Sequence, residues 1–406
     1  MDYRFTPEQE AFRQEFMSWV AKNLPPDYNP ELLHNYETTE DWINAFKMFQ
    51  KRMFDGGYAA MHYPKAYGGQ GKTLMEEVIV LQVTAKMCPE IRQPGGVMLG
   101  MAVPTIYTCC SEAQKHEYLP KIFDGTHIWC QAFSQPNAGS DLANCSTRAV
   151  RKDGYYVLDG QKTWTSFAHM ADYCIILVRT DTTVSKFKGL SYLLLDMKLP
   201  GIEIRPMPQM TGDAEFNEIF FDNVKVPMEM RVGEEGQGWN IAITTLMFER
   251  VIGDARMAAR FESNVLKMIR MAKEVRRSGH PLIDHPVFRQ QLAQAYIEIM
   301  TLKYHGLRNL SKQLAGGIPG PEGSISKILW SEPNQRLSDA AVTMLGPRSQ
   351  IMRGTDWSVQ DGFWQYQFLR SKGNTIEAGT SEIQRNIIGE RCLGLPKDVS
   401  RSMRQK

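Results

Sequence analysis

The sequence predicts a multidomain α+β protein in which a helical region, a β-rich region and a second helical region follow one another. Three observations carry this prediction. Apolar residues recur with helical spacing up to about residue 120, short β-rich runs punctuated by Gly, Asp and Pro follow from about 128 to 235, and the helical spacing then returns. The order of segments is therefore α, then β, then α.

The first region begins with a helix-start signal. Thr6 has the character of an N-cap, Pro7 suits the first turn, and an apolar stripe follows at Phe12, Phe16 and Val20. The same periodicity predicts further helices over residues 40–56, 73–89 and 112–123.

The second region is rich in residues that favour strands, and its composition indicates an antiparallel sandwich or barrel. Its apolar runs are 155–158, 174–178, 190–195, 202–204 and 219–226. The last region predicts helices over about 238–277, 286–315, 321–345, 358–370 and 380–391.

Charge and composition exclude several classes of protein. The 406 residues include 47 Lys and Arg against 45 Asp and Glu, so the net charge of +2 gives no basic excess for binding nucleic acid. No apolar run approaches the roughly 20 residues of a membrane span. The charged N-terminus is unlike a signal peptide, and the seven cysteines form no C-x-x-C pair. We expect a cytoplasmic protein with reduced thiols, no metal ion and no membrane span.

Two glycine-centred stretches are the candidates for chemistry. Residues 129–141 (WCQAFSQPNAGSD) combine small hydroxyl residues with Gly, which lets a planar or phosphorylated ligand approach backbone N–H groups. Residues 374–385 (NTIEAGTSEIQR) turn from a loop into a helix at Thr380 or Ser381, and helix N-termini suit anions. Each stretch taken alone is also compatible with an ordinary turn and helix cap.

Together and in this order, the two stretches resemble the acyl-CoA dehydrogenase family. The resemblance spans nearly the whole chain, and further matching segments are 64–71, 160–166, 220–227, 236–239 and the diagnostic run 382–391. It implies an N-terminal α-helical domain over residues 1–125, a middle β-barrel domain over 126–235 and a C-terminal four-helix-bundle domain over 236–406. It also implies FAD as the cofactor.

The resemblance assigns residues on this chain to the cofactor. It places four residues of the first stretch along the flavin, two residues of the strand-turn segment at the edge and face of its ring, and two residues of the last stretch against FAD: Phe133, Ser134, Gly139, Ser140, Trp164, Ser166, Thr380 and Glu382. Gln135 stands where the family usually has Glu.

In the family, a neighbouring subunit contacts the ADP half of FAD. Its counterpart here is the turn containing Gly346, which lacks the usual second Gly. The usual Arg-x-x-Phe-Gly motif is replaced by residues 276–279 (RRSG), so the contact assigned to Arg276 is displaced.

The implied reaction is α,β-desaturation of an acyl-CoA, which needs a carboxylate base. Many family members carry Glu directly before the Gly-Thr of the last stretch, but Ala378 stands there and Glu377 is one residue early. Other branches carry Glu before Arg on the first long helix of the third domain, as Glu249 and Arg250 do here. We assign the base to Glu249, although the helix pattern alone fits a surface charge pair equally well. The N–H of Ala378 can still donate to the thioester oxygen.

The acyl group is the least constrained part of the prediction. In the family, the region around Arg92 and Gly96 lines the acyl pocket, and the substrate assignments here are Arg92, Gly96 and Arg250. Arg92 fits a clamp for a second carboxylate, as in a substituted succinyl-CoA such as benzylsuccinyl-CoA, or an ordinary solvated loop arginine. A simple branched or steroid side-chain acyl-CoA is the competing substrate.

The resemblance further implies a homotetramer that passes electrons to an electron-transfer flavoprotein. Two rival functions exist on related chains. One is a flavin monooxygenase on the same fold, and the other is a non-catalytic relative that binds nucleic acid, for which the charge balance gives little support.

Overall fold

The computed structural model describes residues 3–317 and 320–397, and within this part it gives only the backbone for residues 249–253. The chain divides into two compact units, and each is described by itself. One comprises the residues up to Glu249 apart from Glu31–Leu33, and the other comprises Glu31–Leu33 with the chain from Arg250 onward. No helix in the described ranges combines the length and the apolar character that crossing a membrane requires.

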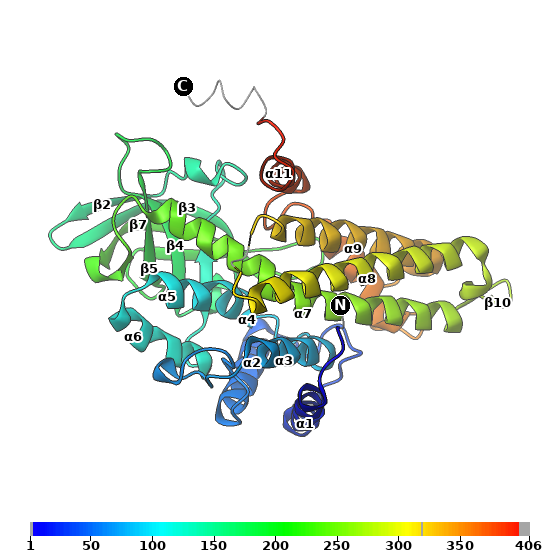
Figure 1. The fold of residues 1–406 in the computed structure, drawn as a ribbon. Coiled ribbons are helices and arrows are strands. Elements are labelled where there is room, and N and C mark those ends of the chain that lie inside the picture. Colours follow the sequence, from blue (N-terminus) through cyan, green and yellow to red (C-terminus); the bar gives the residue numbers. More distant parts are fainter. Residues whose placement is uncertain (1–2, 318–319, 398–406) are drawn as a thin grey trace. The chain divides into compact units, whose positions relative to one another are not determined.

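Helices form the first part of the first unit (Figure 1). They are α1 (Pro7–Asn23), α2 (Thr39–Asp55), α3 (Leu74–Met87), α4 (Gly95–Val97), a π-helical turn (Met98–Ala102), α5 (Val103–Cys109) and α6 (Glu112–Phe123). The predicted N-cap is confirmed, because the Thr6 side chain accepts from the Gln9 N–H and the Gln9 side chain accepts from the Thr6 N–H. Phe16 and Val20 of the predicted stripe are fully buried.

The second part of this unit is an eight-stranded sheet. Its strands are β1 (Trp129–Ala132), β2 (Arg148–Lys152), β3 (Tyr155–Ser166), β4 (Tyr173–Arg179), β5 (Leu190–Asp196), β6 (Ile202–Met207), β7 (Phe216–Pro227) and β8 (Arg231–Val232). The order is β6-β7-β3-β2-β4-β5-β8, and β1 pairs in parallel with β4. Most other pairs are antiparallel, as the composition predicted.

Two neighbouring strands show why this sheet is buried on both faces. In β4, Cys174 and Ile176 face a core formed by the strands themselves, whereas Ile175 and Leu177 face a second core shared with the N-terminal helices. The β5 side chains divide in the same alternating way. The sheet therefore encloses one core and packs helices on its other side, which confirms the predicted barrel-type domain.

The second unit is helical. It contains most of α7 (Gly238–Glu274), then α8 (Pro286–Leu314), α9 (Gly323–Leu345), α10 (Phe363–Ser371), α11 (Ser381–Ile387) and a π-helical turn (Ile388–Cys392). A short hairpin of β9 (Arg276–Arg277) and β10 (His280–Pro281) separates α7 from α8. One core joins α7, α8, α9 and α10. The predicted start of α10 was five residues early, because Asp361 and Gly362 adopt left-handed conformations with φ of 53° and 72°.

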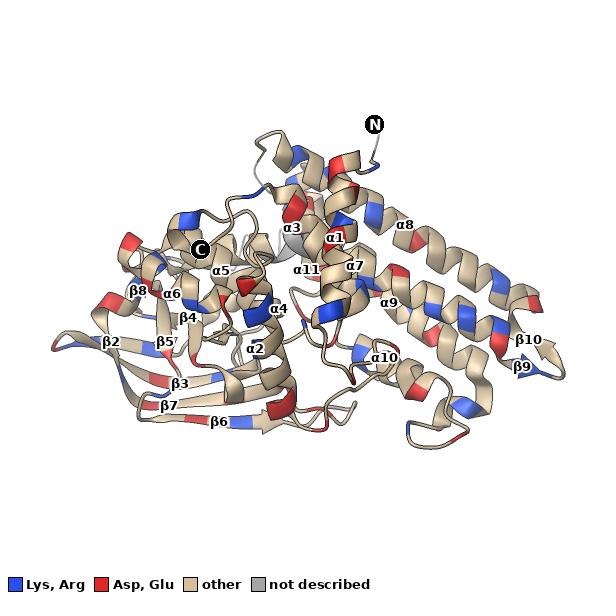
Figure 2. Cartoon of the chain, turned by 90° about the horizontal axis from the view of Figure 1, so that it is seen from below, with Lys and Arg blue, Asp and Glu red and all other residues tan. Residues whose placement is uncertain are grey.

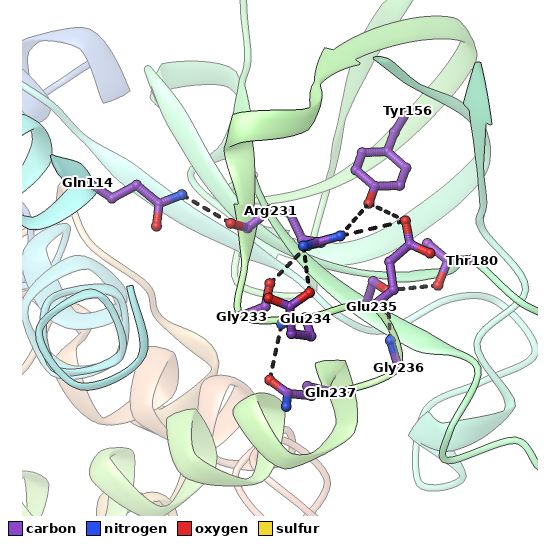
Figure 3. Close-up of polar contacts among 10 residues, drawn as sticks. Gln114, Tyr156, Thr180, Arg231, Gly233, Glu234, Glu235, Gly236 and Gln237 are labelled. Atoms are coloured by element: carbon purple, nitrogen blue, oxygen red, sulfur yellow. Dashed lines mark hydrogen bonds and ion pairs between the residues drawn. The ribbon is translucent and has the colours of Figure 1, made fainter. Parts of the chain in front are cut away.

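The segment that leads from β8 into α7 is held by a cluster around Arg231 (Figure 3). The guanidinium donates to the Gly233 carbonyl at 2.8 Å, pairs with Glu234 at 2.9 Å and lies 3.3 Å from the Tyr156 hydroxyl. The Gln114 amide of α6 donates to the Arg231 carbonyl at 3.1 Å. This cluster fixes where α7 begins relative to the sheet and α6.

Candidate functional site

The first candidate segment leaves the sheet directly after β1. The Thr163 N–H donates to the Ser134 carbonyl at 3.0 Å, and the Lys162 ammonium donates to the Phe133 carbonyl at 2.9 Å. Two consecutive residues of β3 therefore hold two consecutive carbonyls of this segment. Phe133 is buried with its ring edge against Tyr192, and Ser134 is half-buried.

The part of β3 that holds this segment contains a β-bulge. Between Lys162 and Thr165, the strand advances three residues while β7 advances two, from Ile219 to Asn217. Trp164 takes up the extra length in a left-handed conformation with φ of 60°, and its side chain is 60% exposed. A bulge re-aims a side chain, and a non-glycine residue with positive φ stores strain of the kind found at functional sites. The bulge therefore leaves the Trp164 ring exposed.

A tight loop follows Ser134. Gln135 and Ala138 exchange two backbone hydrogen bonds at 3.1 Å, and the Gln135 side chain accepts from the N–H groups of Ser146 and Thr147 while donating to the Ser146 hydroxyl. This buried amide uses both a donor and an acceptor, which explains how Gln is accommodated where the family usually has Glu. Gly139 beyond the loop is exposed, and a Cβ added there would meet no atom within 4 Å.

The second candidate segment, residues 374–382, belongs to the second unit. Ala378 and Gly379 are both left-handed, with φ of 53° and 86°, and the buried Gln384 side chain donates to the Ala378 carbonyl at 2.8 Å. Thr380 is the N-cap of α11, accepting from the Ile383 N–H at 3.2 Å. Backbone hydrogen bonding at this helix start lowers the pKa of Glu382.

The segment is anchored at its start through Asn374. Its carbonyl accepts from the buried Lys327 ammonium, and its side chain bonds to Asn334 and Glu377. Glu377 also forms an ion pair with Arg370 at 2.9 Å. Both described contacts of the Glu377 carboxylate hold the loop in place. This is compatible with Glu249, rather than Glu377, as the base.

A hollow of about 440 Å³ adjoins this segment. It brings Thr380 and Glu382 together with residues of α9 that the sequence did not single out: Glu332, Gln335, Arg336 and Asp339. These lie on a polar helix face that looks like ordinary surface in the sequence. At the start of α11, Ser381 Oγ and Gln384 Oε1 are buried and have no hydrogen-bond partner among the described residues. Such atoms leave hydrogen-bonding capacity for a ligand.

The hairpin between α7 and α8 places its two arginines differently. Arg276 donates to the Gly279 carbonyl at 3.0 Å within its own hairpin. Arg277 instead lies against Gly346, where an added Cβ would collide with its guanidinium. Within this chain, the arginine beside Gly346 is therefore Arg277. The contact of Arg276 with FAD stays a prediction.

Of the predicted substrate residues, the structure describes the side-chain contacts of Arg92 but not those of Arg250. Arg92 is buried, donates to the Gln50 side chain and lies 5.7 Å from the centre of the Phe46 ring. It is therefore not the solvated loop arginine of the alternative reading, and burial lowers its pKa. Gly96 lies in α4. Glu249 and Arg250 lie on α7, and their side chains are outside the described residues.

The α7 turn before Glu249 is well fixed. Thr245 is buried, accepts a hydrogen bond of 2.8 Å from Thr105 on α5 and lies 3.1 Å from the Tyr192 hydroxyl on β5. These contacts bind this part of α7 to both the helices and the sheet of the first unit.

Comparison with protein families accounts for nearly the whole chain. The N-terminal, middle and C-terminal domain models of the acyl-CoA dehydrogenases match residues 6–126, 130–224 and 236–393 in order. The chain belongs to the acyl-CoA dehydrogenase family. This confirms the resemblance inferred from the two glycine-centred stretches.

Individual relatives also align over nearly the whole chain. Acyl-CoA dehydrogenase IpdE1 of Mycolicibacterium smegmatis is 33% identical over 97% of this chain and 99% of its own length. The solved ChsE4–ChsE5 complex from Mycobacterium tuberculosis is 29% identical, with a TM-score of 0.83 over 98% of this chain and 100% of that chain. A structure described as "Tcur3481-Tcur3483 steroid ACAD" is 25% identical with the same TM-score and coverage.

Proposed function

We propose that this acyl-CoA dehydrogenase family member is an FAD-dependent enzyme that desaturates a bulky acyl-CoA between its α and β carbons. The observation that carries the cofactor assignment is the pinned β-bulge, which exposes Trp164 while fixing the carbonyls of Phe133 and Ser134. The unpartnered buried oxygens of Ser381 and Gln384 support it independently. When bound, FAD supplies the acceptor for the hydride that leaves the β-carbon.

The chain's own residues handle the proton. We assign removal of the α-proton to the Glu249 carboxylate, and polarisation of the thioester oxygen to the backbone N–H of Ala378. The left-handed conformation of Ala378 supports the second role, because the Gln384 amide and the Gly379 turn hold that peptide in one orientation. Glu377 supports the first indirectly, since its pairing with Arg370 removes it as a competing base.

The direct test is spectroscopic. The purified chain should carry one FAD and bleach anaerobically when its acyl-CoA is added, with an electron-transfer flavoprotein or a dye as the final acceptor. A protein that cannot be reconstituted with FAD would end the proposal. Rapid reaction of the reduced protein with oxygen, together with no bleaching by any acyl-CoA, would establish the monooxygenase instead.

For the acyl group, we propose a bulky steroid-derived acyl-CoA as the first candidate. Its support is the 25% identical structure described as a steroid ACAD, which aligns over 98% of this chain. A panel of branched, long-chain and steroid side-chain CoA esters, compared by the rate of bleaching, tests it. Preference for an unbranched short-chain ester would contradict it.

The second candidate is a substituted succinyl-CoA such as benzylsuccinyl-CoA, and the burial of Arg92 favours it. This cation contacts an amide and an aromatic ring, and among the described residues it forms no ion pair with a carboxylate. Removing a partner from a buried charge pair costs about 2–5 kcal/mol. Arg92→Met should therefore weaken a dicarboxyl-CoA by tens to thousands of fold and leave a monocarboxyl-CoA of similar bulk unchanged. Equal losses on both esters would assign Arg92 to the scaffold.

We further propose that the chain assembles with other acyl-CoA dehydrogenase subunits, by default as a homotetramer. The exposed face of α8 carries Tyr296, Ile297 and Tyr304 within about 100° of arc, and they are 46%, 59% and 50% exposed. The double variant Ile297→Asp/Tyr304→Asp should yield smaller species in light scattering. Because the ChsE4–ChsE5 structure is a complex, a wild-type monomer that assembles only with a second chain would replace the homotetramer.

Nucleic-acid binding has no comparable support. Lys and Arg are interspersed with Asp and Glu along the long helices and the eight-stranded sheet (Figure 2). Salt-dependent DNA binding by the purified protein would be the contrary result.

A further inference from the structure

Lys162 is a cation buried inside the barrel domain. It is fully inaccessible to solvent, and its ammonium group has two described partners, the Phe133 carbonyl at 2.9 Å and the Cys145 sulfur at 3.3 Å. No ion pair with a carboxylate is formed by Lys162 in the part of the chain that the structure describes. Burial lowers the pKa of Lys162, and the nearby Cys145 opposes that effect.

Burying a lysine ammonium in a core carries a large desolvation penalty. Transfer of an ammonium group out of water is unfavourable unless its partners compensate, and a methionine of similar length would fill the same volume without that cost. Its partner across the strands, Ile219, belongs to the enclosed core, whose buried members are apolar or weakly polar. The position of its donor is therefore the feature that distinguishes lysine from methionine here.

One of the two partners of the ammonium group lies on the first candidate segment. The Phe133 carbonyl is the first of the two carbonyls that β3 holds, and the Thr163 N–H holds the second. The Thr163 N–H is used by the Ser134 carbonyl, and the Phe133 carbonyl is held by the Lys162 side chain instead of a backbone N–H. The lysine therefore supplies one of the two hydrogen bonds that fix this segment next to the β3 bulge at Trp164.

We propose that Lys162 is a positioning residue for FAD, which fixes the 133–134 backbone against the flavin and places a positive charge behind it. This inference rests on the proposed function, since it assumes that this segment faces the cofactor. A positive charge near a bound flavin stabilises the more negative reduced form, so Lys162 raises the reduction potential of the bound cofactor.

Three variants of the full-length protein separate these effects. Lys162→Met removes both donor and charge, Lys162→Gln keeps a donor without the charge, and Cys145→Ala removes the other partner of the ammonium. The measurements are the FAD dissociation constant by flavin fluorescence, the midpoint potential by dye equilibration and the melting temperature of the apoprotein.

Lys162→Met should bind FAD at least tenfold more weakly and lower the ratio of reduced to oxidised affinity about tenfold, which is a drop of ~30 mV for a two-electron couple. Lys162→Gln should recover most of the affinity but keep the lower potential, and Cys145→Ala should change neither more than twofold. A Lys162→Met protein with altered melting temperature but wild-type affinity and potential would overturn the proposal.

If Lys162→Met does not fold, the midpoint potential of Lys162→Gln tests the proposal. A wild-type potential in Lys162→Gln would overturn the role assigned to the positive charge of Lys162. Failure of the FAD assignment gives a different result, because the wild-type chain would then bind no FAD. A flavin monooxygenase would instead show wild-type FAD binding without bleaching by any acyl-CoA.

Discussion

The two candidate segments hold a strained backbone by different means. In the first, Trp164 has a φ of 60° within strand β3. The neighbouring residues 133–134 are held by two hydrogen bonds from β3, one from the Lys162 ammonium and one from the Thr163 N–H. In the second, Ala378 has a φ of 53° within a loop, and the Gln384 side chain of the following helix holds its carbonyl.

This difference has a physical origin. A sheet supplies regular N–H groups and needs a side-chain donor only for a carbonyl that no strand N–H pairs with. A helix start has its own unpaired N–H groups but offers no ladder to the loop before it, so side-chain amides and ion pairs must hold that loop. We therefore expect the sheet-held segment to tolerate changes in its neighbours better than the loop-held segment does.

The largest expected effect concerns the helices that carry the second segment. Asp254 on α7 is buried, accepts from Ser326 and Asn309 at 2.6 and 3.1 Å, and burial raises its pKa to about 7. Because the ordinary pKa is near 4, its contribution to stability is fully present below about pH 4 and is lost as the pH rises through about 7. The free energy of unfolding should fall by as much as ~4 kcal/mol over that range. Asp254→Asn should remove this slope in denaturation curves.

Asp172, at the end of the sheet that holds the first segment, gives the matched control. Burial alone would raise its pKa, but hydrogen bonds from the Ile128 N–H and Lys198 outweigh burial, and the pKa of Asp172 is lowered. Its stabilising contribution is present above its ordinary pKa and is lost as the pH falls through the lowered value. Asp172→Asn should therefore lower the free energy of unfolding at neutral pH. It should leave the fall in that free energy between pH 4 and 7 in place. An unchanged slope in Asp254→Asn would contradict the account.

A smaller effect should follow from Gly379→Ala. Gly379 has a φ of 86°, and an added Cβ would lie 2.5 Å from the Gln384 amide nitrogen that holds Ala378. Left-handed strain of roughly 1–2 kcal/mol then combines with displacement of that amide. We expect FAD affinity to fall at least tenfold in titrations of the apoprotein.

Gly154→Ala is the control for that variant. Gly154 has a φ of 84° in the β2–β3 turn, and an added Cβ there meets no atom within 4 Å. It should lose roughly 1–2 kcal/mol of stability through strain alone and retain FAD affinity. Equal losses of affinity in both variants would mean that strain, rather than the Gln384 contact, is what matters.

The sequence predicted the α–β–α order and a helix start at Thr380 or Ser381, which the structure places at Thr380, because periodicity and capping are local properties. It did not predict Lys162, Gln384 or the α9 side of the hollow, because their roles depend on partners distant in sequence. The position of Arg277 beside Gly346 also had no sequence signal, since only the folded hairpin shows which arginine reaches that turn. The Ala378 conformation also has no sequence signal beyond the glycine that follows it.

The most direct test of the account is the rate of anaerobic flavin reduction in Glu249→Gln, measured by stopped flow with the best acyl-CoA and compared with Glu377→Gln. We predict that Glu249→Gln keeps its FAD and its yellow colour but slows reduction by roughly 10²–10⁴-fold, the usual loss for a general base. Glu377→Gln should slow it far less, because Glu377 holds the loop through Arg370 and Asn374. Near-normal reduction in Glu249→Gln, with a collapse in Glu377→Gln, would contradict the assignment of the base.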